Sequence, residues 1–160
     1  MELQRLGAGH ADALLAFERE NRAYFAASIP DRGDAYFERF GELHRALLAE
    51  QEAGECHFHV LAGADGAVWG RFNLVDVADG AAELGFRVAA WAAGRGVARD
   101  GVRRVCEVAV AEYGLSSLRA RAAVDNVGSR MVLVRSGFRQ VGEVELNGRP
   151  GLRFTRALAE

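Results

Sequence analysis

Residues 88–98 read Val-Ala-Ala-Trp-Ala-Ala-Gly-Arg-Gly-Val-Ala, and this stretch joins a predicted strand to a predicted helix. Gly94 and Gly96 remove side chains where the chain turns into that helix. The first amides of a helix have no partner within it, and the helix dipole is positive there, so such an end suits a pyrophosphate. Arg95 adds a positive charge beside it. The same residues also fit a plain glycine turn with a solvated arginine, and the stretch alone leaves both interpretations open.

Three segments of alternating apolar and polar residues precede this stretch, at residues 57–62, 67–75 and 81–89. Asp65-Gly66 and Asp79-Gly80 separate them, and Asp-Gly pairs favour tight hairpin turns. The pattern predicts an antiparallel meander of three strands.

The stretch is followed by helical and alternating segments in turn. Gly114 and Gly137 are placed to end the two helices, and Asn147-Gly148 joins the last two strands. A strand–helix–strand step inside an otherwise antiparallel sheet makes the sheet mixed. The predicted order is helix, strand, helix, strand and strand, at residues 96–113, 117–124, 126–136, 138–146 and 150–157.

The first third of the chain predicts a short strand at residues 2–6 and two helices at residues 10–27 and 34–53. Pro30 lacks an N–H group and breaks the helical pattern between them. The expected fold class is therefore α/β, with a mixed, mostly antiparallel central sheet of about seven strands flanked by about four helices.

Composition indicates one globular domain over residues 1–160, since 50% of the residues are hydrophobic and 26% are charged. The net charge is −2, and every one of the 20 basic residues is arginine. The absence of lysine excludes a Schiff-base lysine and a phosphate-loop lysine. Because the arginines are scattered, we expect neither a nucleic acid nor a membrane surface as partner.

Cys56 and Cys106 are the only cysteines, too few for a disulfide framework or a cysteine-rich zinc site. Residues 1–12 lack the apolar core of a signal peptide, and no apolar run approaches the length of a membrane span. We therefore expect a cytoplasmic protein.

A second informative stretch, residues 125–138, reads Asp-Asn-Val-Gly-Ser-Arg-Met-Val-Leu-Val-Arg-Ser-Gly-Phe. Together the two stretches resemble the GCN5-related N-acetyltransferase (GNAT) superfamily, and within it the RimJ/RimL-like ribosomal-protein N-terminal acetyltransferases. The superfamily signature Gln/Arg-x-x-Gly-x-Gly/Ala falls on residues 93–98, where Gly96 and Ala98 match and Ala93 departs. The second pattern of the branch matches at Asn126, Ser129, Gly137 and Phe138.

The resemblance implies that acetyl-CoA is the co-substrate. The strand at residues 83–88 would expose backbone amides to the thioester and hold the pantetheine arm, to which Asn126 would hydrogen-bond. The cofactor-binding residues it implies are Phe86, Val88, Gly94, Arg95, Gly96, Val97, Ala98, Asn126 and Ser129.

Two residues are candidates for proton transfer. Many superfamily members use a tyrosine on the last helix to protonate the leaving thiolate, but Leu133 stands at that position. Ser129 is then the candidate donor, unless its hydroxyl only satisfies a backbone amide at the helix start. Glu83 is the candidate base, because a carboxylate in a half-closed pocket can take the ammonium proton directly or through water. The alternative is a surface glutamate on a strand.

The acceptor side would be covered by the two early helices and the break between them. Tyr24 and Tyr36 flank that break and are candidate substrate contacts, although core packing is the stronger explanation for aromatic residues there. Arg71 and Asn73 share one face of their strand and are further candidates. His57 and His59 also share a face, but no acidic or cysteine cluster completes a metal site, and no metal is expected.

The expected function is direct transfer of an acetyl group from acetyl-CoA to a primary amine in a ternary complex. The acceptor is a protein N-terminus or a small-molecule amine, and the pocket residues do not choose between them. The alternative is a non-catalytic acetyl-CoA-binding sensor or interaction module. The final hairpin offers an edge for a possible homodimer.

Overall fold

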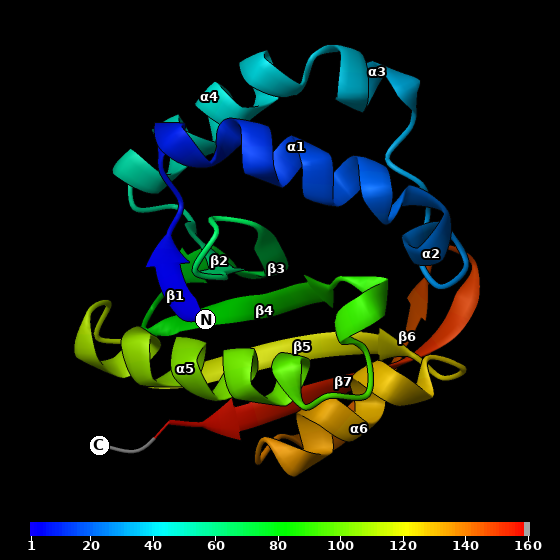
Figure 1. The fold of residues 1–160 in the computed structure, drawn as a ribbon. Coiled ribbons are helices and arrows are strands. Elements are labelled where there is room, and N and C mark those ends of the chain that lie inside the picture. Colours follow the sequence, from blue (N-terminus) through cyan, green and yellow to red (C-terminus); the bar gives the residue numbers. More distant parts are fainter. Residues whose placement is uncertain (159–160) are drawn as a thin grey trace.

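A seven-stranded sheet forms the centre of the computed structural model, which describes residues 1–158 (Figure 1). The strands lie in the order β1-β2-β3-β4-β5-β7-β6, and every neighbouring pair is antiparallel except β4 with β5. The predicted mixed sheet is therefore confirmed. The strands are β1 (Glu2–Arg5), β2 (His57–Ala62), β3 (Val68–Ala78), β4 (Ala81–Val88), β5 (Ser117–Ala123), β6 (Arg139–Leu146) and β7 (Arg149–Ala157). Residues 159 and 160 of the expected domain lie outside the described residues.

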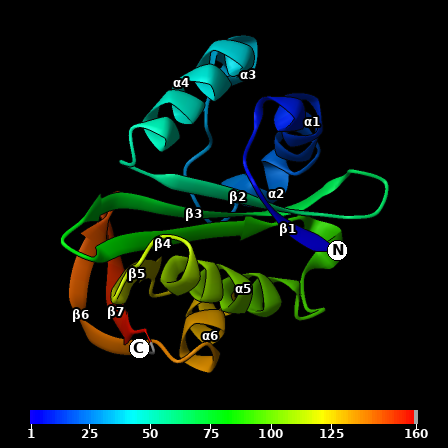
Figure 2. The same ribbon diagram turned by 90° about the vertical axis from the view of Figure 1, so that its left-hand side faces the viewer.

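Helices cover both faces of the sheet, with α1 to α4 on one face and α5 and α6 on the other (Figure 2). This arrangement makes three layers with the apolar core on both sides of the strands. The helices are α1 (Ala11–Glu20), α2 (Arg22–Ala26), α3 (Asp34–Glu38), α4 (Phe40–Glu52), α5 (Val97–Ala111) and α6 (Val127–Arg135), with short 3-10 turns η1 (Ala8–His10) and η2 (Ala90–Ala92). Within residues 1–158, no helix combines the length and the apolar character that crossing a bilayer requires.

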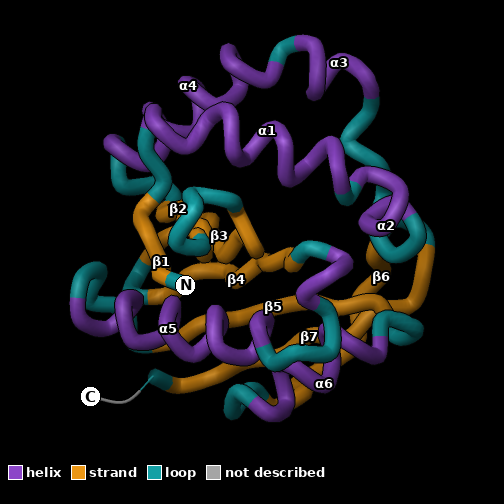
Figure 3. The backbone as a smooth tube through the Cα atoms, viewed as in Figure 1, coloured by secondary structure: helices purple, strands orange, loops and turns teal. Residues whose placement is uncertain are grey.

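Residues 1–158 form six α-helices where four were expected, because each of the two early helices is interrupted (Figure 3). Asn21 separates α1 from α2, and Arg39 separates α3 from α4. The side-chain amide of Asn21 donates to the carbonyl oxygen of Phe17 at 2.8 Å, which competes with the regular helical hydrogen bonds. A side-chain competition of this kind leaves the apolar spacing intact, so periodicity alone does not reveal it.

Close packing of α5 on the sheet fixes the position of that helix. Phe72 of β3 is fully buried, and a Cβ atom added at Gly101 of α5 would lie 2.1 Å from the Phe72 ring. Only glycine therefore allows the helix backbone to approach the ring this closely. The contact holds the N-terminal end of α5 beside the end of β4.

Candidate active site

A cavity of about 820 Å³ opens where β4 and β5 separate. The two parallel strands pair only between residues 81–83 and 117–119. Residues 84–88 of β4 and residues 120–123 of β5 then line the cavity from opposite sides. Because these inner strand edges are not paired with each other, their backbone N–H and C=O groups are available to a ligand.

The glycine turn before α5 forms one end of the cavity. Gly94 and Gly96 have φ values of 75° and 76°, in the left-handed region that glycine adopts without strain. A Cβ atom at either position would meet no atom within 4 Å, so the space in front of this turn is open. Val97 and Ala98, in the first turn of α5, also line the cavity. The turn therefore presents unpaired helix amides to the cavity, as an anion site requires.

The start of α6 forms another part of the wall. Asn126 is the N-cap of this helix, and its Oδ1 accepts a hydrogen bond from the Ser129 amide at 3.3 Å. Both residues line the cavity. The backbone amide of Ser129 at the helix start thus donates to Asn126. The Ser129 hydroxyl is not the group that satisfies this amide, in contrast to the structural role considered for it above. Within residues 1–158 this hydroxyl makes no hydrogen bond, so it is available to a ligand or to water.

Eight of the nine residues expected to bind the cofactor line this one cavity, although they come from β4, the glycine turn, α5 and α6. The exception is Arg95, which is exposed and is not among the lining residues. Arg99, in the first turns of α5, lines the cavity instead. The eight residues are Phe86, Val88, Gly94, Gly96, Val97, Ala98, Asn126 and Ser129.

Glu83 lies at the point where β4 and β5 begin to separate, and it does not line the cavity. Its Oε2 accepts from Arg121 Nη2 at 2.9 Å, and its Oε1 lies 3.7 Å from Arg119 Nε. Arg121 does line the cavity and therefore connects Glu83 to it.

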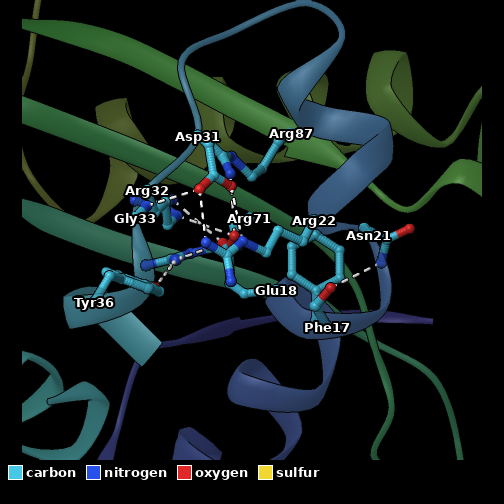
Figure 4. A network of polar contacts seen from close by, with 10 residues as sticks. All are labelled: Phe17, Glu18, Asn21, Arg22, Asp31, Arg32, Gly33, Tyr36, Arg71 and Arg87. Atoms are coloured by element: carbon cyan, nitrogen blue, oxygen red, sulfur yellow. Dashed lines mark hydrogen bonds and ion pairs between the residues drawn. The ribbon is translucent and has the colours of Figure 1, made fainter. Parts of the chain in front are cut away.

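The four candidate acceptor contacts do not lie together. Tyr24 is exposed and lines the cavity, whereas Tyr36, Arg71 and Asn73 do not. Arg71 is buried, and its Nη1 donates to Glu18 Oε2 at 2.8 Å and to the Tyr36 hydroxyl at 3.2 Å. Asn73 is half-buried, and its Oδ1 has no partner within residues 1–158. Tyr36 and Arg71 thus belong to a polar network beside the cavity (Figure 4).

Glu18 is the centre of that network and was not predicted from the sequence. Its side chain is only 1% exposed and forms ion pairs with Arg32, Arg71 and Arg87. Burial by itself raises the pKa of Glu18, but the hydrogen bond from Arg32 and the charges of the three arginines outweigh it, so the pKa is lowered. The partners lie 14, 53 and 69 residues away, so no local pattern indicates the network.

The lining of the cavity has one sign of charge. It includes five arginines, and among the described residues no aspartate, glutamate or histidine lines it. A cationic wall beside unpaired helix amides favours phosphate groups. The arginines are Arg87, Arg99, Arg121, Arg135 and Arg149.

The two histidines on β2 do not line the cavity, and His59 is buried whereas His57 is half-buried. Phe72 O accepts from His59 Nδ1 at 3.2 Å, and His59 Nε2 lies 2.7 Å from the Tyr113 hydroxyl. His57 stacks on the Tyr113 ring with 3.6 Å between ring centroids. Across residues 1–158, no group of three or more histidine, cysteine or acidic residues is placed to hold a metal ion.

The sequence profile of the acetyltransferase (GNAT) domain family matches residues 1–139. The chain is 27% identical over 148 residues to a probable N-acetyltransferase, YjcK, of Bacillus subtilis (strain 168), covering 86% of this chain and 82% of that protein.

Solved structures share the fold at low sequence identity. A ribosomal-protein-S5-alanine acetyltransferase from Vibrio fischeri superposes with a TM-score of 0.90 at 18% identity, covering 99% of this chain and 93% of that one. Spermidine N-acetyltransferase from Vibrio cholerae, in complex with CoA and spermine, gives a TM-score of 0.79 at 20% identity. The match covers 98% of this chain and 95% of that one. The fold is therefore that of acetyltransferases, and its neighbours include the ribosomal-protein branch expected from the sequence.

Proposed function

Because the chain belongs to the GNAT family of acetyltransferases, we propose that residues 1–160 act as one domain that transfers an acetyl group from acetyl-CoA directly to a primary amine. The observation that carries this proposal is the cavity between β4 and β5. It brings the glycine turn, the unpaired strand edge and the start of α6 to one place. No covalent enzyme intermediate is needed, since amine and thioester react within one ternary complex.

The residues present fit acetyl-CoA, the co-substrate of this family. The open space at Gly94 and Gly96 and the amides at the start of α5 suit the pyrophosphate. Arg99 and Arg135 also line the cavity and supply positive charge for phosphate groups. The inner edge of β4 and the side-chain amide of Asn126 are placed to hydrogen-bond an extended arm. Acetyl-CoA supplies the activated acetyl group.

Backbone amides of β4 support the transfer itself. Attack by an amine puts negative charge on the carbonyl oxygen of the thioester, and preorganised N–H donors stabilise such a charge. Residues 84–88 offer these donors along an edge that pairs with no strand on the cavity side. The rigid sheet holds them in place before the reaction begins.

Ser129 supplies or positions the proton that the leaving thiolate takes up. Its hydroxyl lines the cavity and has no structural hydrogen bond within residues 1–158. A serine hydroxyl is a weak acid by itself, so an ordered water held by Ser129 performs the same step. Leu133, at the position where many family members carry tyrosine, is buried in the core and is not available.

Glu83 acts as the base through water rather than by direct contact with the amine. Its carboxylate lies outside the cavity lining and reaches it only through Arg121. Since no acidic residue or histidine lines the cavity within residues 1–158, the ammonium proton leaves by way of a water molecule. The acceptor is a protein N-terminus or a small-molecule amine.

The proposal is tested by steady-state kinetics with acetyl-CoA and a panel of amines, with acetylated product identified by mass. A ternary complex gives intersecting initial-rate lines, whereas a covalent acetyl-enzyme gives parallel lines. The Cys56→Ser, Cys106→Ser double variant is expected to keep its activity, because neither cysteine lines the cavity. Acetyl-CoA binding without turnover of any amine would contradict the enzymatic proposal and favour a sensor.

A further inference from the structure

Three guanidinium groups surround the single buried carboxylate of Glu18 (Figure 4). Arg32 Nε lies 3.0 Å from Oε1, Arg71 Nη1 lies 2.8 Å from Oε2, and Arg87 Nη1 lies 3.0 Å from Oε1. One carboxylate balances the charge of one guanidinium. The cluster of Glu18, Arg32, Arg71 and Arg87, which we call the Glu18 cluster, therefore carries a surplus of positive charge.

The neighbouring acidic residues do not remove this surplus. Asp31 and Asp34 both pair with Arg22, at 2.8 Å each, on the exposed side of the cluster. Counting these residues with the cluster gives four arginines against three carboxylates. A net positive charge remains, and neither Asp31 nor Asp34 lines the main cavity.

Arg87 is the member of the Glu18 cluster that lines the main cavity. Its side chain is 17% exposed and also lies over the Phe25 ring at 4.6 Å. Burial, with the positive charges of Arg32 and Arg71, lowers the pKa of Arg87 to about 10, and Glu18 partly opposes this, so the group stays charged at neutral pH. A hollow of only about 10 Å³ lies on its other side, so a ligand reaches Arg87 from the main cavity.

The other arginines of the cavity have different partners. Arg121 pairs with Glu83, and Arg149 pairs with Asp125. Arg99 and Arg135 belong to α5 and α6, the side proposed for the phosphates of acetyl-CoA. Arg87 instead faces the wall formed by α2 and the segment after it, which includes Tyr24 and Ser28.

Given the proposed acetyl transfer, on which this inference rests, we propose that the acceptor is an amine that also carries an anionic group, and that Arg87 binds this group. A carboxylate at Arg87 would balance the surplus charge of the Glu18 cluster and accept charge-assisted hydrogen bonds. A polyamine would place further positive charge in a cavity that has no acidic lining within residues 1–158. The structure thus favours an acidic acceptor over a polycationic one.

The charge preference is measured first with matched acceptors. Ala-Glu-Ala amide and Ala-Gln-Ala amide match in size and differ in the charge near one free amine. Ala-Arg-Ala amide places a positive charge there, and spermidine supplies a polycation. We expect kcat/KM for the glutamyl peptide to exceed that for the glutaminyl peptide by roughly tenfold or more. The arginyl peptide and spermidine should be slower still. L-Glutamate as a fifth acceptor separates a small amino acid from a peptide N-terminus.

Variants then assign the preference to Arg87. Arg87→Gln should raise KM for the glutamyl peptide about tenfold and leave KM for the glutaminyl peptide nearly unchanged. Arg87→Lys keeps the charge and should retain part of the preference. Arg32→Gln, at a side chain that is 28% exposed, weakens the same cluster without changing the cavity wall. Arg39→Gln is the matched control, because the partner Glu42 lies on the same exposed helix surface. This variant should leave KM unchanged for both the glutamyl and the glutaminyl peptide.

Each outcome decides between the two proposals. Acetylation of the peptides with equal rates, or a preference for spermidine, overturns the inference about Arg87 and leaves acetyl transfer standing. A preference for the glutamyl peptide that survives in Arg87→Gln overturns the assignment to this residue. If no amine is acetylated although acetyl-CoA binds, acetyl transfer itself is overturned and the inference falls with it.

Discussion

Glu83 and Arg119 form the last residue pair that joins the parallel strands β4 and β5. Beyond this pair the strands separate, and the cavity begins with residues 84 and 120. The carboxylate of Glu83 also holds Arg121, which stands at the cavity wall two residues further along β5. The ion pair therefore lies at the boundary between the closed part of the sheet and the site.

Glu83→Gln tests the role of this residue as a base. We expect kcat to fall at least about tenfold, because a general base typically contributes more than this to proton transfer. Binding of acetyl-CoA should not change. Arg119 and Arg121 are 44% and 46% exposed, so stability should change by less than about 1 kcal/mol. An unchanged kcat with an unchanged pH–rate profile would show that water alone removes the proton.

Ser129→Ala should lower kcat by about 10- to 100-fold, because it removes the hydroxyl proposed to deliver or position a proton. KM for acetyl-CoA and the melting temperature should stay close to their original values, since Asn126 caps the helix. Ser136→Ala is a matched control, because Ser136 Oγ is buried without a partner within residues 1–158 and lies outside the cavity. Equal kcat values for both variants would argue against a role for Ser129.

Gly96→Asp should abolish the stabilisation that acetyl-CoA gives. At a concentration one hundred times Kd, a ligand adds about 2.7 kcal/mol, or roughly 5–10 °C in Tm for a chain of this size. The aspartate places a side chain and a negative charge in the open space in front of the glycine turn. Gly54→Asp is the control, because its φ of 77° imposes the same backbone strain far from the cavity. Thermal shifts that persist in Gly96→Asp would contradict the pyrophosphate assignment.

The stability of the fold should depend on pH through His59. Burial lowers the pKa of His59 from 6.5 to about 4, so the unfolded chain binds a proton that the folded chain does not. The contribution of His59 to the free energy of unfolding is therefore greatest above pH 6.5. It falls by about 3 kcal/mol as the pH decreases toward 4. Denaturant titrations at several pH values measure this slope, and His59→Gln should flatten it. The same slope in both proteins would assign the effect to other groups.

Gly101→Ala should destabilise the protein by about 1–3 kcal/mol, because its added Cβ overlaps the Phe72 ring. The shift of α5 should also weaken acetyl-CoA binding, since the glycine turn moves with the helix. Gly9→Ala serves as the control, because a Cβ at Gly9 meets nothing within 4 Å. Thermal unfolding of both variants is sufficient, and an unaltered Tm for Gly101→Ala would contradict this packing.

Local features of the sequence predicted most of the elements and most of the residues proposed to bind the cofactor. The glycine turn at Gly94 and Gly96 and the cap at Asn126 carry their signals within a few residues, and the structure brings them together. Arg95 was expected at the anion site, but it is not among the lining residues, whereas Arg99 is.

The Glu18 cluster could not be predicted because its members come from α1, β3, β4 and the segment before α3. A buried glutamate is rare in folded proteins, and only the three distant arginines make Glu18 stable there. For the same reason the hydrogen bonds of Arg71 to Glu18 and to the Tyr36 hydroxyl could not be predicted from the sequence. Neither Arg71 nor Tyr36 lines the cavity, and their roles as acceptor contacts stay predictions.

The early separation of β4 from β5 means that the sheet consists of two parts, β1–β4 and β5–β7, joined along the strands by only three residue pairs. Anything that lies in the gap and hydrogen-bonds to the backbone occupies the place of a missing strand. Acetyl-CoA would then complete the architecture as well as supply the acetyl group.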